Sequence, residues 1–315
     1  MPVGKHESSF SCVKGKSWLT TGREKVFART TAGLWREANK NKRIRPMARP
    51  ELTIEQIKAL IPIASDVQEL DRGGQKLVFT GVIGGQKYAL KFLSPNPSQA
   101  IGPSEEPLDD VTARAQREVE TMQQCSTPYL VRMGPIGLQS ADVDGKPVIY
   151  FSEEFIEGKN LKQYLQETGP LSIDELIRLA LHISEAINTI WQFSKIHRDI
   201  KPSNIMRRSA SGEFVLLDMG LVFDLQDASL SVAPVGTPLY FSPEQMDFSN
   251  RRTVMNFRSD LFSLGIVLYE MATRRHPFLT PTATTTWEVL GNIATMIPEP
   301  SVPMIVRHLP LEKLV

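Results

Sequence analysis

The chain has 315 residues, of which 41% are hydrophobic and 23% charged, a composition that is typical of a globular protein and excludes a largely disordered one. Its two cysteines lie far apart, which excludes a disulfide framework and favours a reducing compartment. No apolar run approaches membrane-spanning length, and the start, MPVGKHESSF, lacks the apolar core of a secretory signal. We therefore expect no membrane span and an intracellular, cytoplasmic location, with the nucleus as the alternative.

The net charge of +1 hides an asymmetry between a basic N-terminal extension and the rest of the chain. Residues 1–50 carry 12 Lys and Arg against 3 Glu, whereas the remainder carries 24 Lys and Arg against 32 acidic residues. Residues 21–40 could form a helix, and Lys40–Arg45 is a short basic run. We expect a linker or docking arm with an anionic partner, and a solvated extension is the alternative.

A small β-rich lobe that opens with a helix is expected over residues 51–157. The apolar residues of Leu52–Ile61 have helical spacing, and Pro62 ends this helix. Three β-rich segments follow, and Gly84-Gly85 between the first two is typical of a hairpin turn. The segments are Leu77–Phe79, Tyr88–Leu93 and Val148–Phe151.

Lys91 lies in one of these strands between apolar neighbours, so its ammonium group needs a partner. An amphipathic helix from about Asp109 to Gln124 offers Glu118. Glu120, on another face of the helix, is the alternative partner. Glu118 could also be an ordinary exposed carboxylate.

A longer helix and a polar loop follow in the second half of the chain. Ser172 and Glu175 form a capping box that opens a helix to about Phe193. The next residues, His197–Asn204, read HRDIKPSN and place a carboxylate, an ammonium and a carboxamide within a short loop. Such a set could accept a hydroxyl proton, neutralise a phosphate and bind a metal ion.

This loop resembles the catalytic loop of eukaryotic-type Ser/Thr protein kinases. Further segments resemble other kinase motifs in the expected order: YALK (Tyr88–Lys91), DMG (Asp218–Gly220), GTPLYFSPE (Gly236–Glu244) and DLFSLG (Asp260–Gly265). The resemblance implies a bilobed α+β fold, with a small antiparallel sheet and one helix in residues 51–157 and a larger, mainly helical lobe in residues 158–315. It implies ATP and Mg²⁺ as cofactors and a protein as substrate.

The resemblance also implies a role for individual residues. Asp199, Lys201, Lys91 and Glu118 are the expected catalytic residues, and Asn204 and Asp218 the expected metal ligands. Asp199 would orient or deprotonate the substrate hydroxyl, and Lys201 would stabilise the γ-phosphate. The expected nucleotide-binding residues are Gly73, Gly74, Lys76, Val78, Ala89, Lys91, Glu154, Ile156 and Met206.

The chain departs from the family pattern at several places. The glycine-rich turn keeps only Gly73 in register, and Lys76 stands where its last glycine would be, so Lys76 is expected to supply charge to the phosphates. Glu153 guards the back of the adenine site, which predicts a polar partner there. Only 37 residues follow Phe278, which indicates a truncated or divergent end and a lower lobe covered by a partner. Arg307 is a weak candidate for the arginine expected to pair with Glu244.

Three functions remain open from the sequence. The first is ATP-dependent phosphorylation of Ser or Thr in proteins, with autophosphorylation. Phosphate groups on Ser229 and Ser231 could then pair with Arg198 and Arg114. Constitutive activity, without such regulation, is the alternative. The second is a pseudokinase that binds nucleotide or acts as a scaffold. The third, a small-molecule phosphotransferase, is opposed by the GTPLYFSPE segment.

Overall fold

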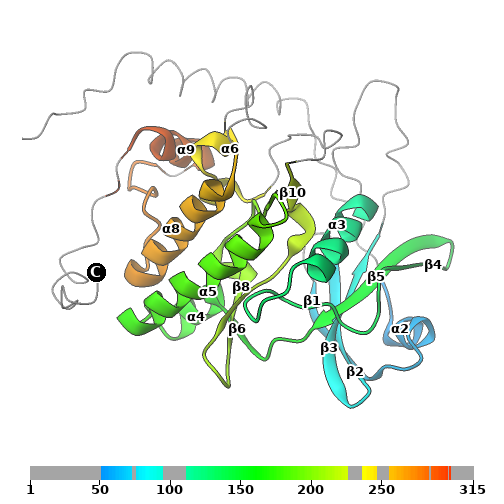
Figure 1. Ribbon diagram of the computed structural model, residues 1–315. Helices are drawn as coiled ribbons and strands as arrows, with labels where there is room; N and C mark the ends of the chain where they lie inside the picture. Colours follow the sequence, from blue (N-terminus) through cyan, green and yellow to red (C-terminus); the bar gives the residue numbers. More distant parts are fainter. Residues whose placement is uncertain are drawn as a thin grey trace, which may run out of the picture.

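The computed structural model describes residues 51–72, 76–94, 111–225, 236–246, 255–283, 285–296 and 298. The N-terminal extension, the turn with Gly73 and Gly74, and Ser229, Ser231 and Arg307 lie outside these residues. The described part has two lobes, one built on a β-sheet and one on helices (Figure 1). This is the α+β architecture that the sequence predicts.

The small lobe is a five-stranded antiparallel sheet with the strand order β1-β2-β3-β5-β4. Gly84 and Gly85, with φ values of 59° and 81°, form the predicted turn between β2 and β3. The sequence predicts parts of β2, β3 and β5 but misses β1 and β4, which are short on apolar residues. The strands are β1 (Ser65–Arg72), β2 (Lys76–Ile83), β3 (Gln86–Leu93), β4 (Gln139–Val143) and β5 (Lys146–Glu154).

Two helices accompany this sheet. Helix α2 (Ile54–Leu60) is the predicted leading helix, and the side chain of Thr53 caps it by accepting a hydrogen bond from the Gln56 amide. Helix α3 (Val111–Gln124) buries a stripe that includes one charged residue, Glu118. Figure 1 shows α3 on the side of the sheet that faces the large lobe.

Antiparallel pairing places six residues that matter for the site on one face of the sheet. Val78 lies opposite Lys91, which in turn lies opposite Phe151, and Ala89 lies opposite Glu153. Residues two apart on a strand share a face, so Lys76 joins this set beside Val78. This register brings Lys76, Val78, Ala89, Lys91, Phe151 and Glu153 together.

The large lobe is mainly helical, and its two long helices pack against each other (Figure 1). Helix α5 (Ile173–Trp191) begins at the predicted Ser172 capping box and buries an apolar stripe of Leu179, Ile183, Ala186, Ile187 and Ile190. The other helices are α4 (Leu161–Glu167), α6 (Pro243–Met246), α8 (Phe257–Thr273) and α9 (Thr286–Thr295). Among the described helices, none combines the length and the apolar character that a bilayer crossing requires.

Short strands hold the loops of the large lobe in place. A three-stranded sheet has the order β6-β8-β9, and β7 pairs with β10. The predicted catalytic loop runs from the end of β7 to the start of β8. The strands are β6 (Gly158–Asn160), β7 (Lys195–Ile196), β8 (Ile205–Arg208), β9 (Phe214–Leu216) and β10 (Phe223–Asp224).

Asp260, in the first turn of α8, anchors the catalytic loop from below. Its two carboxylate oxygens accept hydrogen bonds from the backbone N–H groups of His197, at 2.7 Å, and Arg198, at 2.9 Å. Burial raises the pKa of Asp260, and the two backbone donors oppose that shift. Arg198 has a φ of 68°, a left-handed conformation that is costly for a non-glycine residue, so this anchor holds a strained turn.

The described segment after Phe278 contains one further helix. Helix α9, which the sequence analysis missed, begins at a capping box of Thr285 and Glu288 and packs into an apolar cluster with Phe241 and Phe278. Glu244 accepts a hydrogen bond from the Ser259 hydroxyl at 2.6 Å. Glu244 therefore has a hydroxyl partner within the described residues, and its pairing with Arg307, which lies outside them, stays a prediction.

We predict that Leu179→Ala lowers the free energy of unfolding by about 2–5 kcal/mol because it opens a cavity at a fully buried position. Leu181→Ala on the same helix is the control. This side chain is 64% exposed, so its loss should change the free energy by at most about 0.5 kcal/mol. Urea denaturation of both variants measures the difference. Equal effects would contradict the burial pattern of α5.

We predict that Asp260→Ala lowers the free energy of unfolding by roughly 2–5 kcal/mol, since it leaves two buried backbone donors unpaired. Asp260→Asn keeps one accepting oxygen and should cost less. Urea denaturation measures both variants, and hydrogen exchange at the amides of His197 and Arg198 should speed up most in Asp260→Ala. Unchanged exchange at these amides would contradict the anchoring role.

Candidate active site

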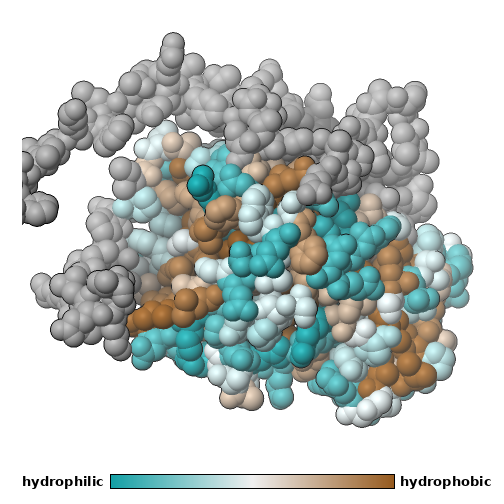
Figure 2. Space-filling view, in the orientation of Figure 1, coloured by the Kyte–Doolittle hydropathy of each residue, from teal (hydrophilic) through white to brown (hydrophobic). Residues whose placement is uncertain are grey.

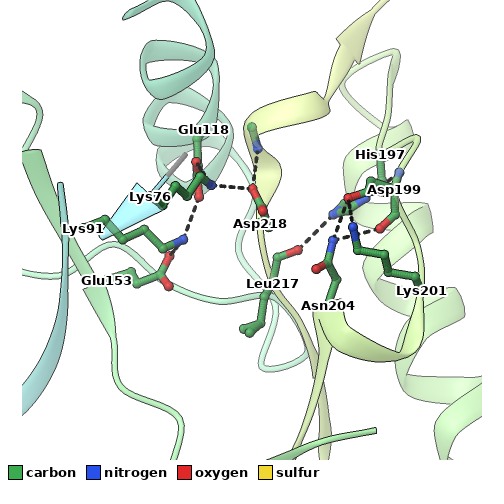
Figure 3. Close-up of polar contacts among 11 residues, drawn as sticks. Lys76, Lys91, Glu118, Glu153, His197, Asp199, Lys201, Asn204, Leu217 and Asp218 are labelled. Carbon is green, nitrogen blue, oxygen red and sulfur yellow. Dashed lines mark hydrogen bonds and ion pairs between the residues drawn. The ribbon is translucent and has the colours of Figure 1, made fainter. Parts of the chain in front are cut away.

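The candidate site lies where the sheet face of the small lobe meets the loops of the large lobe (Figure 3). On the face that Figure 2 shows, the surface between the lobes is mainly hydrophilic, whereas hydrophobic residues gather over the small lobe. Polar side chains from both lobes therefore converge in this region. They form two groups, one around Asp199 and one around Glu118.

Asp199 is nearly buried and is fixed by four hydrogen bonds from side chains and one from the backbone. Its Oδ1 accepts from the Thr237 amide at 3.0 Å and the Thr237 hydroxyl at 2.9 Å. Its Oδ2 accepts from Lys201 Nζ at 2.7 Å and Asn204 Nδ2 at 3.0 Å. A second bond from Asn204 Nδ2 goes to the Asp199 carbonyl. The carboxylate thus has a defined orientation beside an ammonium and a hydroxyl group.

Thr237 was not among the predicted site residues, although the GTPLYFSPE motif that contains it carried the signal. Its hydroxyl also accepts a hydrogen bond from Lys201 Nζ at 2.8 Å. The preceding Gly236 has a φ of 121°, and a Cβ there would come within 2.9 Å of the Arg198 carbonyl oxygen. Glycine is required at this position because the GTPLYFSPE segment approaches the catalytic loop so closely.

Backbone contacts bring Asp218 beside the catalytic loop. The Asn204 carbonyl accepts the Leu217 N–H at 2.8 Å, and His197 Nε2 lies 3.1 Å from the Leu217 carbonyl oxygen. Asp218 itself has a φ of 61°, and its Oδ1 accepts the Gly220 N–H at 3.3 Å. Met219 is buried in the main core, where an apolar and adaptable side chain packs well.

The predicted ion pair of Lys91 and Glu118 is present, with 2.7 Å between Nζ and Oε1. Both residues are buried, which explains why each needs the other. Burial lowers the pKa of Lys91, but Glu118 and Glu153 more than offset this and raise it. Glu120, the alternative partner, instead accepts a hydrogen bond from Gln116 on the same helix.

Three further charges extend this pair into a row that crosses the site (Figure 3). Glu153 Oε2 lies 2.6 Å from Lys91 Nζ, so Lys91 is the polar partner predicted for Glu153. Lys76 Nζ lies 2.9 Å from Glu118 Oε2 and 2.7 Å from Asp218 Oδ1. The order Asp218, Lys76, Glu118, Lys91, Glu153 alternates in sign. The sequence predicted a phosphate-directed Lys76 but not its two carboxylate partners.

The local environment shifts the pKa values of the acidic residues at the two ends of this row in opposite directions. Burial raises the pKa of Glu153, and Lys91 opposes the shift. Partial burial would also raise the pKa of Asp218, but Lys76 and Lys91 hold it well below the ordinary value. Gly220 makes room for these charges, since a Cβ there would come within 3.1 Å of Glu118 Oε2 and 3.2 Å of Asp218 Oδ1.

The side-chain oxygen atoms of Asp218 and Asn204 are of the type that binds a magnesium ion. The Asp218 side chain is 36% exposed, and Asn204 turns its amide nitrogen toward Asp199, which leaves its side-chain oxygen on the other side. Carboxylate and amide oxygens are the hard ligands that Mg²⁺ takes. Groups of three or more His, Cys, Asp or Glu residues with metal-binding geometry do not occur in the described part of the chain.

The other expected nucleotide-binding residues line the same region with different degrees of exposure. Ala89 and Ile156 are buried, whereas Val78 on β2 and Met206 on β8 are partly exposed. The Glu154 carboxylate is held by Arg132 at 3.0 Å and Arg208 at 2.7 Å, partners that the sequence analysis missed. The side chain of Glu154 is therefore engaged, which leaves its backbone as the part able to contact a ligand.

Arg198, expected as a phosphate receptor, makes contacts of a different kind. Its Nε donates to the Leu221 carbonyl at 2.8 Å, and its guanidinium lies 4.7 Å from the centre of the Phe223 ring. The side chain is thus packed against the segment that follows the DMG motif. The predicted acceptors Ser229 and Ser231 are not among the described residues, so their pairing with Arg198 and Arg114 stays a prediction.

Comparison with known proteins agrees with this geometry. A probable serine/threonine-protein kinase PknB of Lactococcus lactis is 32% identical over 218 residues, which are 67% of this chain and 32% of that protein. A probable serine/threonine-protein kinase of Corynebacterium efficiens is 31% identical over 212 residues, or 65% of this chain and 30% of that protein. The serine/threonine-protein kinase PknB of Mycobacterium leprae is 32% identical over 169 residues, or 53% and 26%.

The chain spans about a third of the length of the first of these curated relatives. The family model of the protein kinase domain matches residues 65–304, which include both lobes and the whole candidate site. This match covers well over half of the chain. The chain therefore belongs to the protein kinase domain family.

Proposed function

We propose that this chain transfers the γ-phosphate of ATP to Ser or Thr hydroxyls of protein substrates, with autophosphorylation, in the presence of Mg²⁺. The observation that supports this most is the fixed orientation of Asp199 beside Lys201 and Thr237. Phosphoryl transfer needs little covalent chemistry from the protein, so positioning and charge carry most of the catalysis. Such an arrangement of rigidly held charges suits that demand.

Asp199 is the proposed base that orients the attacking hydroxyl. Its oxygens already accept a hydroxyl hydrogen bond, from Thr237, so the carboxylate can hold a substrate hydroxyl in a similar way. Lys201, 2.7 Å from Asp199, is the proposed cation for the transferred phosphate. The GTPLYFSPE segment beside this site is the proposed platform for the substrate polypeptide, and it is held to the lobe by the Ser263 hydroxyl, which donates to the Tyr240 carbonyl at 2.6 Å.

Asn204 and Asp218 are the proposed metal ligands, and bound Mg²⁺ would neutralise charge on the phosphate oxygens. Val78, Ala89 and Met206 are the proposed contacts for adenine, together with backbone groups of Glu154 and Ile156. Gly73 and Gly74 would cover the phosphates. An ammonium group on the small lobe completes the phosphate site, and the chain offers two, Lys91 and Lys76.

The pseudokinase is the second candidate function. The altered glycine-rich turn and the Glu153 carboxylate support it, because both change the surroundings of the nucleotide. The Lys91–Glu118 ion pair and the defined positions of Asp199, Asn204 and Asp218 oppose it. We also propose an anionic partner for residues 1–50, where the sequence is strongly basic.

We predict that Asp199→Asn lowers kcat for transfer to a generic protein by about 10²- to 10⁴-fold, because the hydroxyl loses its proton acceptor. Glu120→Gln on α3 is the matched control and should leave kcat unchanged, since among the described residues Glu120 accepts its hydrogen bond from Gln116 of the same helix. Transfer of radiolabelled γ-phosphate, followed by phosphoamino-acid analysis, gives both the rate and the acceptor type. A wild-type chain that binds ATP without any transfer would support the pseudokinase.

A further inference from the structure

The two lysines in the row of five alternating charges differ in their own exposure and in the exposure of their carboxylate partners. Lys91 lies between two carboxylates, with Nζ 2.7 Å from Glu118 Oε1 and 2.6 Å from Glu153 Oε2, and its side chain is 7% exposed. Lys76 is 24% exposed and lies at the start of β2, directly after the turn that holds Gly73 and Gly74. Figure 3 shows Lys91 on the side of Glu153 and Lys76 on the side of Asp218.

Movement of Lys91 toward a phosphate would leave Glu153 without its counter-charge. Glu153 is 5% exposed, and Lys91 is its ion-pair partner among the described residues. Removing one partner of a buried ion pair leaves an uncompensated charge, which is strongly unfavourable. The buried Glu153 therefore holds Lys91 in its structural role, as the cation shared by two carboxylates.

Movement of Lys76 leaves no carboxylate unpaired. Its first partner, Glu118, keeps its bond to Lys91. Its second partner, Asp218, is the proposed metal ligand, so a bound cation would take over its compensation. Lys76 Nζ already lies 2.7 Å from the Asp218 oxygen, on the side of the row where a metal-bound phosphate would lie. Of the two ammonium groups, Lys76 is the one that can turn to a phosphate without an uncompensated charge.

We propose that Lys76 is the lysine that binds the nucleotide phosphates in this chain, and that Glu153 assigns this role to it by retaining Lys91 as the buried counter-ion of Glu118. The proposal rests on the proposed function and names the residue that neutralises charge on the nucleotide phosphates. Glu153 acts here as a positioning residue, through Lys91. Compared with the kinase pattern, Lys76 adds a positive charge on β2 and Glu153 adds a negative charge on β5. The two added charges compensate each other in the phosphate site.

Calorimetric titration of the full chain with ATP and with adenosine, each with and without Mg²⁺, tests the role of Lys76. Lys76→Met should weaken ATP binding by about tenfold or more, as expected for the loss of a charged hydrogen bond, and leave adenosine binding unchanged. Lys58→Met on the exposed face of α2 is the control and should change neither affinity. Equal ATP affinity in wild type and Lys76→Met would overturn the proposal, as would a wild type that binds adenosine and ATP equally.

A pair of variants tests the role of Glu153. Lys91→Met should lower the melting temperature, because Glu153 loses its counter-charge. Lys91→Met combined with Glu153→Met should restore the melting temperature, since an apolar pair can replace a buried ion pair. The double variant should also keep the preference for ATP over adenosine and recover phosphoryl transfer. A stable double variant that has lost this preference would overturn the proposal and return the phosphate role to Lys91.

These readouts separate the proposal from the proposed function. A chain that binds ATP through Lys76 but transfers no phosphate would support the assignment of Lys76 and overturn the kinase activity. A chain that transfers phosphate with Lys76→Met at the wild-type ATP affinity would support the activity and overturn the assignment.

Discussion

The ionic contact between Lys76 and Asp218 links the two lobes of the molecule. It depends on the buried charges of Glu118, Lys91 and Glu153, which continue the row. Buried ions must be paired and hydrogen-bonded, because otherwise the free-energy cost of removing them from water exceeds the stabilisation from their mutual attraction. In this site each interior carboxylate or ammonium has an opposite charge on either side. The positions of β2, β3, β5, α3 and the DMG turn are therefore coupled, because a shift of any one breaks a pair.

The catalytic loop is organised by a different principle, in which one buried carboxylate satisfies backbone donors. Asp260 holds His197 and Arg198 from α8, and the loop then presents Asp199 to Lys201, Asn204 and Thr237. The large lobe thus supplies rigidity through neutral backbone groups, whereas the small lobe supplies ammonium groups that are paired with carboxylates. A phosphoryl-transfer site needs both, since the acceptor must be aimed and the phosphate charge must be neutralised.

The sequence alone predicted those features that depend on local pattern. The apolar neighbours of Lys91 showed that it needed a partner, helical spacing favoured Glu118 over Glu120, and the motifs placed Asp199, Asn204 and Asp218 in their order along the chain. These signals need no knowledge of strand register. For the same reason the two lobes and most of their long helices were predicted.

What the sequence could not predict depends on contacts between distant segments. The Lys91–Glu153 pair follows from the register of β3 against β5, and the partners of Lys76 follow from the approach of the DMG turn. The bond from Ser259 to Glu244 likewise follows from the approach of α8 to α6. Helix α9 was not predicted, although the capping box of Thr285 and Glu288 that opens it is a local signal in the sequence.

The bond between Ser259 and Glu244 also determines how one contact between α6 and α8 responds to dissolved salt. An ion pair weakens as salt screens its two full charges. A hydroxyl group that donates to a carboxylate at 2.6 Å instead depends on direct contact and geometry, and it carries no full charge of its own to screen. This contact between the two helices should therefore depend little on ionic strength.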